Sequence, residues 1–282
     1  MKYIFWMVLL LFIASEVLSQ SNSNSNYLLI NATDKIGFSY LELTDPYLSP
    51  ITYSGLGLSY EHSSAKFFST DNNRLSNEGR ISGWGGLALN PQNSAAMLYA
   101  GAKYSWGIFY HLNIFPQFNI KVGGNTEFDL GYKNLTRNVN NPVNVDLALN
   151  LNAAAKASYS IPIHRKTIIL NYELESPIIG VMFVPMGGAS YFEMFELGSL
   201  TNSFHFSSLH NKLGFTNQLS VAYPFKRSTW QIGIKSANLK YQANEMLFKR
   251  NIYSINIGIK YDLNIFSGRL NAAPKNFIGP EK

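Results

Sequence analysis

One segment near the end of the chain limits the fold more than any other: "NIYSINIGIKYDLNIF", residues 251–266. From Tyr253 to Leu263 every second residue is apolar or aromatic, and the residues between them are Ser254, Asn256, Gly258, Lys260 and Asp262. Side chains of a β-strand point alternately to two faces, so this segment predicts a strand with one apolar and one polar face.

The same period of two recurs along the chain. It runs through residues 118–133, 145–159, 168–175 and 213–223, where apolar residues alternate with Asn, Lys, Glu, Asp and Ser. No segment shows a comparable helical period. An all-β fold follows, because strict alternation over nine or more residues is typical of strands.

Strand length decides between two all-β architectures. Strands of soluble sandwiches average about five or six residues, whereas these run to ten or more. At about 3.3 Å per residue, the eight steps from Tyr253 to Tyr261 rise about 26 Å. Tilted by about 40°, they span about 20 Å, close to the apolar band of an outer-membrane barrel. We therefore predict a transmembrane antiparallel up-and-down β-barrel, with a soluble exported β-sandwich binding module as the alternative.

The number of strands has two solutions. Nine strands are clear between residues 53 and 263, and residues 28–43 add a tenth. The segment 178–210 contains "VMFVP" and "YFEMFELG", which would form one more hairpin. We expect about 12 strands, with 10 as the alternative. Both counts place the turns 161–166 and 224–228 on the periplasmic side and the segments 134–142 and 178–210 outside.

The N-terminus reads as a secretory signal peptide. Lys2 precedes an apolar run from Ile4 to Ile13, and small residues precede a cut after Ser19. The predicted organisation is therefore a signal peptide at 1–19, a polar spacer at 20–27, an outer-membrane barrel at 28–266 and a periplasmic tail at 267–282. The expected location is the outer membrane of a Gram-negative bacterium.

The last strand carries a second pattern. Asn256, Gly258, Tyr261 and Leu263 fit polar-x-Gly-x-x-aromatic-x-apolar. This resembles the final-strand signal by which bacterial outer-membrane barrels engage their assembly machinery, so that machinery and outer-membrane lipid are the expected partners. The pattern departs from such signals in position, because residues 264–282 follow it.

Composition excludes several kinds of site. The chain has no cysteine, which removes disulfides, thiolate metal sites and a cysteine nucleophile. Its net charge of +6 comes from scattered Lys and Arg, whereas a nucleic-acid binder clusters them. Five histidines show no metal-ligand spacing. We expect no nucleic-acid partner, no metal and no cofactor.

Alternation assigns two groups of residues to the two faces of the barrel. The lumen-facing charged group comprises Lys121, Glu127, Asp129, Lys156, Glu173, Glu175 and Lys260. It is either an interior ion-pair network or a polar path for a small solute, since buried charges must pair. The expected membrane-interface aromatics are Tyr253, Tyr261, Tyr132, Tyr159 and Trp106.

A His-x-Ser pair offers the sharpest enzymatic hypothesis. His62 and Ser64 share the outward face of one strand, which resembles the outer-membrane phospholipase arrangement of serine nucleophile, histidine base and orienting asparagine. The sequence supplies no evident asparagine, and the neighbouring residues depart from that family's His-Glu-Ser-Asn type pattern. The competing interpretation is that the apolar band ends after Tyr60 and polar residues enter the headgroup zone.

Two stretches resemble a known family. "YLSPITYSG" (47–55) and "SPIIGVMFVPMGGASYFEMFELG" (176–198) are similar to a domain-of-unknown-function family of exported β-rich proteins from Bacteroidota, presumed to be outer-membrane barrels. The resemblance implies a compartment and a fold, but no reaction. The resulting hypothesis is a non-enzymatic barrel with a structural or scaffold role, or a narrow passage for small polar solutes. Any protein partner is expected at the outer loop 178–210.

Overall fold

The computed structural model describes residues 27–69, 73–164, 166–196, 199–225, 228–264 and 277–280. Within them, ten long strands form one ring: β1 (Tyr27–Asp45), β2 (Ser49–Phe67), β3 (Leu75–Leu89), β4 (Ala96–Phe115), β5 (Phe118–Leu135), β6 (Val143–Ile163), β7 (Lys166–Phe183), β9 (Lys212–Pro224), β10 (Thr229–Ala243) and β11 (Met246–Asn264). The shorter elements are α2 (Tyr191–Glu196), η1 (Ser199–Ser203), β8 (Phe204–Ser208) and β12 (Phe277–Ile278).

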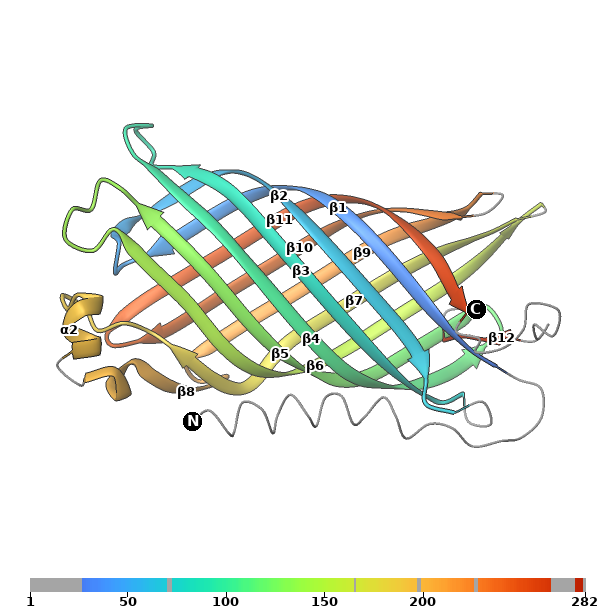
Figure 1. Ribbon diagram of the computed structural model, residues 1–282. Helices are drawn as coiled ribbons and strands as arrows, with labels where there is room; N and C mark the ends of the chain where they lie inside the picture. The colour runs from blue at the N-terminus through green and yellow to red at the C-terminus, as the bar shows by residue number, and fades with distance from the viewer. Residues whose placement is uncertain are drawn as a thin grey trace.

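The ring is closed by its first and last long strands. β1 pairs antiparallel with β11 from Leu29↔Asn264 to Thr44↔Lys249, and each other strand pairs with its neighbour in the order of the chain. Figure 1 shows the strands tilted around a common axis. The prediction of a closed antiparallel up-and-down barrel is confirmed, and a two-sheet sandwich is excluded.

The ring of ten matches the alternative strand count and not the preferred twelve. The segment 178–210 does not cross the barrel as a hairpin. β7 continues to Phe183, the chain then passes through α2 and η1, and β8 returns beside the end of β7. Pro185 and Gly188 lie where β7 stops. Proline lacks an N–H for the ladder, and Gly188 has a φ of 80°, so neither continues a strand.

The two ends of the barrel differ (Figure 1). One end, here called the terminal mouth, holds the start of β1, the end of β11 and the tight connections β6–β7 and β9–β10. The opposite end, here called the α2 mouth, holds α2 and the connections β5–β6 and β10–β11. The segments 134–142 and 178–210 thus share one end, away from 161–166 and 224–228.

Side chains follow the expected alternation along β11. Ile255 and Ile257 are 60% and 53% exposed, whereas Ser254 and Asn256 between them are buried. The same holds on β1, where Ile36 and Phe38 are exposed and Lys35 is buried. The molecule therefore presents apolar residues on its outer wall and polar residues in its interior, the reverse of a soluble protein.

An apolar cluster fills the interior at the α2 mouth. Its members include Tyr99, Met97, Leu41, Tyr241 and Phe248, with the Tyr241 and Phe248 rings stacked at 4.8 Å. These residues project inward from β1, β4, β10 and β11. They close the lumen below the mouth.

The α2 segment lies over that cluster. The Tyr191 hydroxyl accepts from the Val145 N–H at 2.8 Å, and the Tyr47 hydroxyl donates to the Ala189 carbonyl at 2.8 Å. Burial raises the pKa of Tyr47 to about 12. Ser190 and Glu193 form a capping box, and hydrogen bonds from Ser190 lower the pKa of Glu193.

At the terminal mouth, β12 pairs in parallel with the first residues of β1, Tyr27↔Phe277 and Leu28↔Ile278. Gly279 and Pro280 are buried there, and Leu29 is only 2% exposed. The predicted signal peptide at 1–19 and nearly all of the spacer at 20–27 lie outside the described residues. Among the residues described, no helix is both long and apolar enough to cross a membrane.

The β1–β11 seam makes the first prediction. A Cβ on Gly258 would lie 2.5 Å from the Asp34 carbonyl oxygen, so Gly258→Ala forces the seam apart. We expect a loss of about 1–3 kcal/mol in the free energy of unfolding, measured by guanidinium titration in detergent. In the control Gly79→Ala, the nearest atom is Ser64 Oγ at 3.6 Å, and stability should be unchanged. Equal stabilities of the two variants would contradict this.

Candidate functional site

The barrel interior holds a chain of ion pairs that begins beneath the α2 mouth. Lys133 Nζ lies 2.9 Å from Asp45 Oδ2 and 2.8 Å from Asp146 Oδ1. The Asp45 side chain is fully buried and also accepts from Asn144 Nδ2 at 2.7 Å. Asp45 is the last residue of β1. Its contacts with Lys133 and Asn144 therefore connect the end of β1 to β5 and β6.

The middle of the lumen is crossed by a second group. Arg250 of β11 forms a bidentate pair with Asp129 of β5, and its Nη1 also donates to the Tyr99 hydroxyl at 3.0 Å. Lys103 Nζ lies 3.0 Å from Glu127 Oε2. Lys212 Nζ donates to Asn150 Oδ1 at 2.7 Å. The Arg250–Asp129 pair joins strands that are far apart around the ring, whereas the pair of Lys103 with Glu127 joins the neighbouring strands β4 and β5.

Arg80 of β3 organises a third group, nearer the terminal mouth. Its guanidinium lies 2.8 Å from Glu173, 3.3 Å from Glu175 and 3.9 Å from Glu61. Glu61 in turn receives Lys35 at 3.1 Å and Lys235 at 2.7 Å. Glu61 therefore lies within 4.0 Å of three cations, and Arg80 lies within 4.0 Å of three carboxylates.

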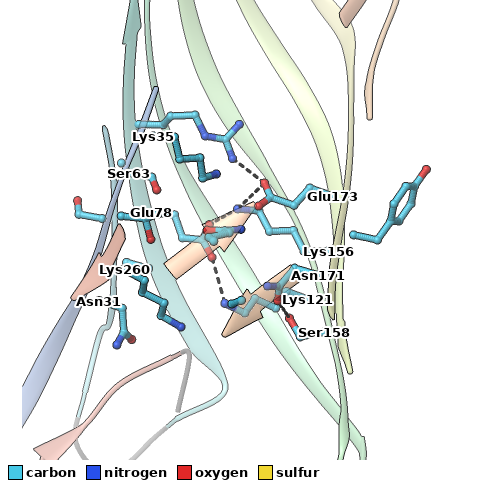
Figure 2. Close-up of a pocket in the computed structure, with 18 of the residues that line it drawn as sticks. Asn31, Lys35, Ser63, Glu78, Lys121, Lys156, Ser158, Asn171, Glu173 and Lys260 are labelled. Carbon is cyan, nitrogen blue, oxygen red and sulfur yellow. Dashed lines mark hydrogen bonds and ion pairs between the residues drawn. The ribbon is translucent and has the colours of Figure 1, made fainter. Parts of the chain in front are cut away.

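Next to this group is a cavity of about 50 Å³, drawn in Figure 2. Glu78 lies 3.5 Å from Lys121 Nζ and pairs with Lys156, which also lies 3.4 Å from Glu173. Lys260 projects from β11 on the opposite side of the cavity in Figure 2. Five basic and two acidic side chains line the space: Lys35, Arg80, Lys121, Lys156 and Lys260, with Glu78 and Glu173.

The lumen is divided into small compartments. Beyond the first cavity lie others of about 80, 40 and 20 Å³. The first two share Lys35 and Arg80, and the second and third share Lys103 and Arg250. Each has room for one or a few waters. The described interior is therefore packed by ion pairs and is not a wide pore.

The seven charged residues assigned to the lumen from the sequence all lie on its inner wall. Arg80 brings Glu173 and Glu175 together, and Lys156 joins that group through Glu173. Glu127 and Asp129 belong to the middle group, and Lys121 and Lys260 line the first cavity. Four further residues organise these groups but were not among those assigned to the lumen from the sequence: Glu61, Glu78, Arg80 and Arg250. The alternation along their strands would have placed them on the inner face as well.

The aromatic residues expected at membrane interfaces lie on the outer wall. Tyr253, Tyr132 and Tyr159 are 40–46% exposed. Tyr261 is less exposed, and its hydroxyl donates to Asp34 Oδ2 at 2.7 Å. Trp106 lies midway along β4 and not near either end.

The four residues of the proposed assembly signal lie along the seam strand β11. Asn256 faces the interior, and Gly258 packs against the backbone of β1. Tyr261 bonds Asp34 across the seam, and Leu263 is exposed on the outer wall. Glycine is required at 258 by the close approach of the two strands.

His62 has a partner that sequence reasoning missed. Its Nδ1 lies 2.8 Å from Oδ1 of Asp34, the residue paired with it across β1 and β2. Tyr60 also donates to that oxygen at 2.7 Å. Ser64 lies two residues along the same face, and no hydrogen bond joins it to His62 within the described residues. No cluster of three potential metal-ligating side chains occurs in the part of the chain that is described.

Comparison with known proteins gives a family and remote structural likenesses. The family model "Protein of unknown function (DUF3316)" matches residues 4–270. No curated protein matches the chain.

Two solved structures illustrate the structural likenesses. The transport unit of the autotransporter AIDA-I from Escherichia coli is 12% identical, with 88% of this chain and 94% of that one covered and a TM-score of 0.44. The outer membrane protease OmpT from Escherichia coli is 6% identical, with 87% and 99% covered and a TM-score of 0.45. Both TM-scores are low.

The middle ion-pair group makes the second prediction. In Arg250→Met the cation nearest to the buried Asp129, among the described residues, is the more distant Lys103, 3.9 Å away. We expect the free energy of unfolding to fall by about 3–5 kcal/mol in guanidinium titrations. Lys249→Gln, on the exposed side of the same strand, is the control. A loss within about 0.5 kcal/mol for Arg250→Met, the range typical of surface changes, would contradict the role assigned to this pair.

Proposed function

Because this chain belongs to the family described as "Protein of unknown function (DUF3316)", we propose its role from the barrel itself. The protein is a non-enzymatic outer-membrane β-barrel with a structural or scaffold role. A signal peptide at 1–19 directs its export from the cytoplasm of a Gram-negative bacterium, of the Bacteroidota, and is removed during export. The barrel-assembly machinery inserts it, with β11 as the final strand.

One observation carries the membrane placement: the outer wall is apolar and the interior is charged. Exposed apolar side chains occur on each of the ten ring strands, among them Phe38, Leu58, Phe128 and Ile257. Exposed apolar surface of this extent marks an interaction with lipid or protein. A belt around a closed barrel fits lipid, because every strand contributes to it and closure leaves no unpaired edge.

The closed interior supports a structural role over passage of solutes. The apolar cluster below the α2 mouth and the Arg80 and Arg250 groups block a straight path. A narrow passage would require the α2 segment and this cluster to move together. The α2 segment also exposes Phe192 and Phe195, at 72% and 61%, which supports the loop 178–210 as the surface for a protein partner.

Two measurements test this proposal. Protein in the outer-membrane fraction should migrate faster on SDS gels when unboiled than when boiled, because a closed barrel resists the detergent. Purified barrel in planar bilayers should show no steady conductance. Soluble protein without a heat-dependent shift would overturn the membrane placement, and steady channel openings would favour solute passage over a scaffold.

The hydrogen bond between Asp34 and His62 favours a second candidate, a lipid hydrolase. It occupies Nδ1 of His62 and leaves Nε2 to take the proton from Ser64 Oγ as the oxygen attacks an ester carbonyl. The protonated imidazole would then pass that proton to the leaving alcohol, and water would release the fatty acid from the serine. Asp34 takes the orienting role for which the sequence offered no asparagine.

The hydrolase candidate predicts that Ser64→Ala abolishes fatty-acid release from phospholipid–detergent micelles. Ser63→Ala is the matched control, because Ser63 is the next residue of β2 and its side chain points to the opposite face of the strand. Asp34→Asn should reduce turnover while leaving lipid binding intact. Equal fatty-acid release by the wild type, by Ser64→Ala and by micelles without the barrel would remove this candidate.

A further inference from the structure

We infer that the 80 Å³ cavity in the middle of the lumen is a binding site for a small oxyanion, a phosphate or a carboxylate. This site is separate from the outer-wall residues His62 and Ser64. It also does not depend on the proposed scaffold role, because an anion can bind in a barrel that conducts or in one that does not.

The charges around the cavity are unequal. Five basic side chains line it: Lys35, Arg80, Lys103, Lys235 and Arg250. Three carboxylates line it: Glu61, Glu127 and Glu175. Arg80 and Arg250 also pair with carboxylates that do not line the cavity, Glu173 and Asp129. The excess of positive charge therefore lies at Lys35 and Lys235, which share the single carboxylate Glu61. A buried cation that shares its counter-charge is incompletely compensated, so this part of the cavity favours an added negative charge.

The same cavity contains polar donors that have no acceptor. Trp84 Nε1 and Asn256 Nδ2 are buried and have no hydrogen-bond partner among the described residues. Both residues line this cavity, and Asn256 is only 8% exposed. Indole N–H and amide N–H groups require acceptors, and a buried donor without one is costly. Water would satisfy these donors but would not offset the excess of positive charge.

An oxyanion would supply both the negative charge and the hydrogen-bond acceptors that this cavity lacks. It supplies several acceptor oxygens and one or two negative charges, and ammonium and guanidinium groups are the usual partners of phosphate and carboxylate in proteins. Hydroxyls of Ser59, Ser82, Ser105 and Ser254 on the wall add further donors. The cavity volume limits the ligand to a small ion.

An anion would reach this site from the terminal mouth. The first cavity, drawn in Figure 2, shares Lys35 and Arg80 with the oxyanion site. It is itself lined by more basic than acidic side chains, so it attracts anions towards the site. The apolar cluster blocks the opposite approach from the α2 mouth.

The site has a built-in spectroscopic probe. Trp84 lines the cavity, whereas Trp106 and Trp230 are exposed on the outer wall. In the exported barrel, which has lost Trp6 with the signal peptide and carries Trp106→Phe and Trp230→Phe, emission reports on Trp84 alone. Titration of the detergent-solubilised barrel with inorganic phosphate, or with acetate, should give a saturable change in emission and a rise in melting temperature. Sodium chloride at matched ionic strength should give neither.

Two variants test whether the response comes from this cavity. Lys235→Gln should weaken the apparent phosphate affinity by about tenfold, since it removes a charged donor. Ser254→Asp places a carboxylate opposite Lys235 in the strand register and should keep the fold while abolishing the response. Lys249→Gln, exposed on the same strand, should bind as the wild type does.

Three outcomes would overturn the inference. The first is no saturable change in Trp84 emission, which would leave water alone in the cavity. The second is an equal response to chloride, which would indicate general screening. The third is an unaltered response in Ser254→Asp. None of these results bears on whether the barrel lies in a membrane, which the gel and bilayer measurements decide.

Discussion

The pairing of β1 with β11 is the interaction on which the rest of the structure depends. It joins sixteen residue pairs, from Leu29↔Asn264 to Thr44↔Lys249, and removes both edges of the sheet at once. An unpaired edge would leave a row of backbone donors and acceptors exposed, at high cost in lipid. Closure also separates an inside from an outside, so each residue of every strand is committed to one of two surroundings. Gly258 permits this closure, because it lies against the backbone of β1.

The interior charges follow from that enclosure. A lysine or glutamate on the inner wall has lost most of its water and needs a partner across the lumen. The partners come from strands that are distant in sequence: Arg250 of β11 meets Asp129 of β5, and Arg80 of β3 meets Glu173 of β7. Such pairs brace opposite walls. They also leave spaces between them, and at the space proposed as the oxyanion site Lys35 and Lys235 share one carboxylate.

The two mouths differ in the side chains that face the lumen. At the α2 mouth the inward residues are apolar and large, and the segment between β7 and β8 packs over them, with hydrogen bonds from Tyr47 and Tyr191. Towards the terminal mouth the first cavity is lined mainly by charged and polar side chains, with more basic than acidic groups. A polar solute therefore meets a polar, basic interior from one side and an apolar barrier from the other.

Alternation along the strands predicted the barrel and the inner location of Lys121, Glu127 and Asp129, because the period of two is a local property of each strand. Strand number was less certain, since Pro185 and Gly188 interrupt the segment that suggested an extra hairpin. Trp84 shows a further limit of the pattern, because a large aromatic residue in a barrel strand suggests the outer wall, yet it lines the interior.

The amino-acid sequence by itself determined which face each side chain takes and that the strands are too long for a small sandwich. Only the tertiary structure decided which charges meet, which donors lack acceptors and that Asp34 stands opposite His62. The physical reason is that alternation depends on neighbours one and two residues away, whereas ion pairs and cavities depend on the register between strands and on the closure of the ring. Neither register nor closure is a property of any single strand.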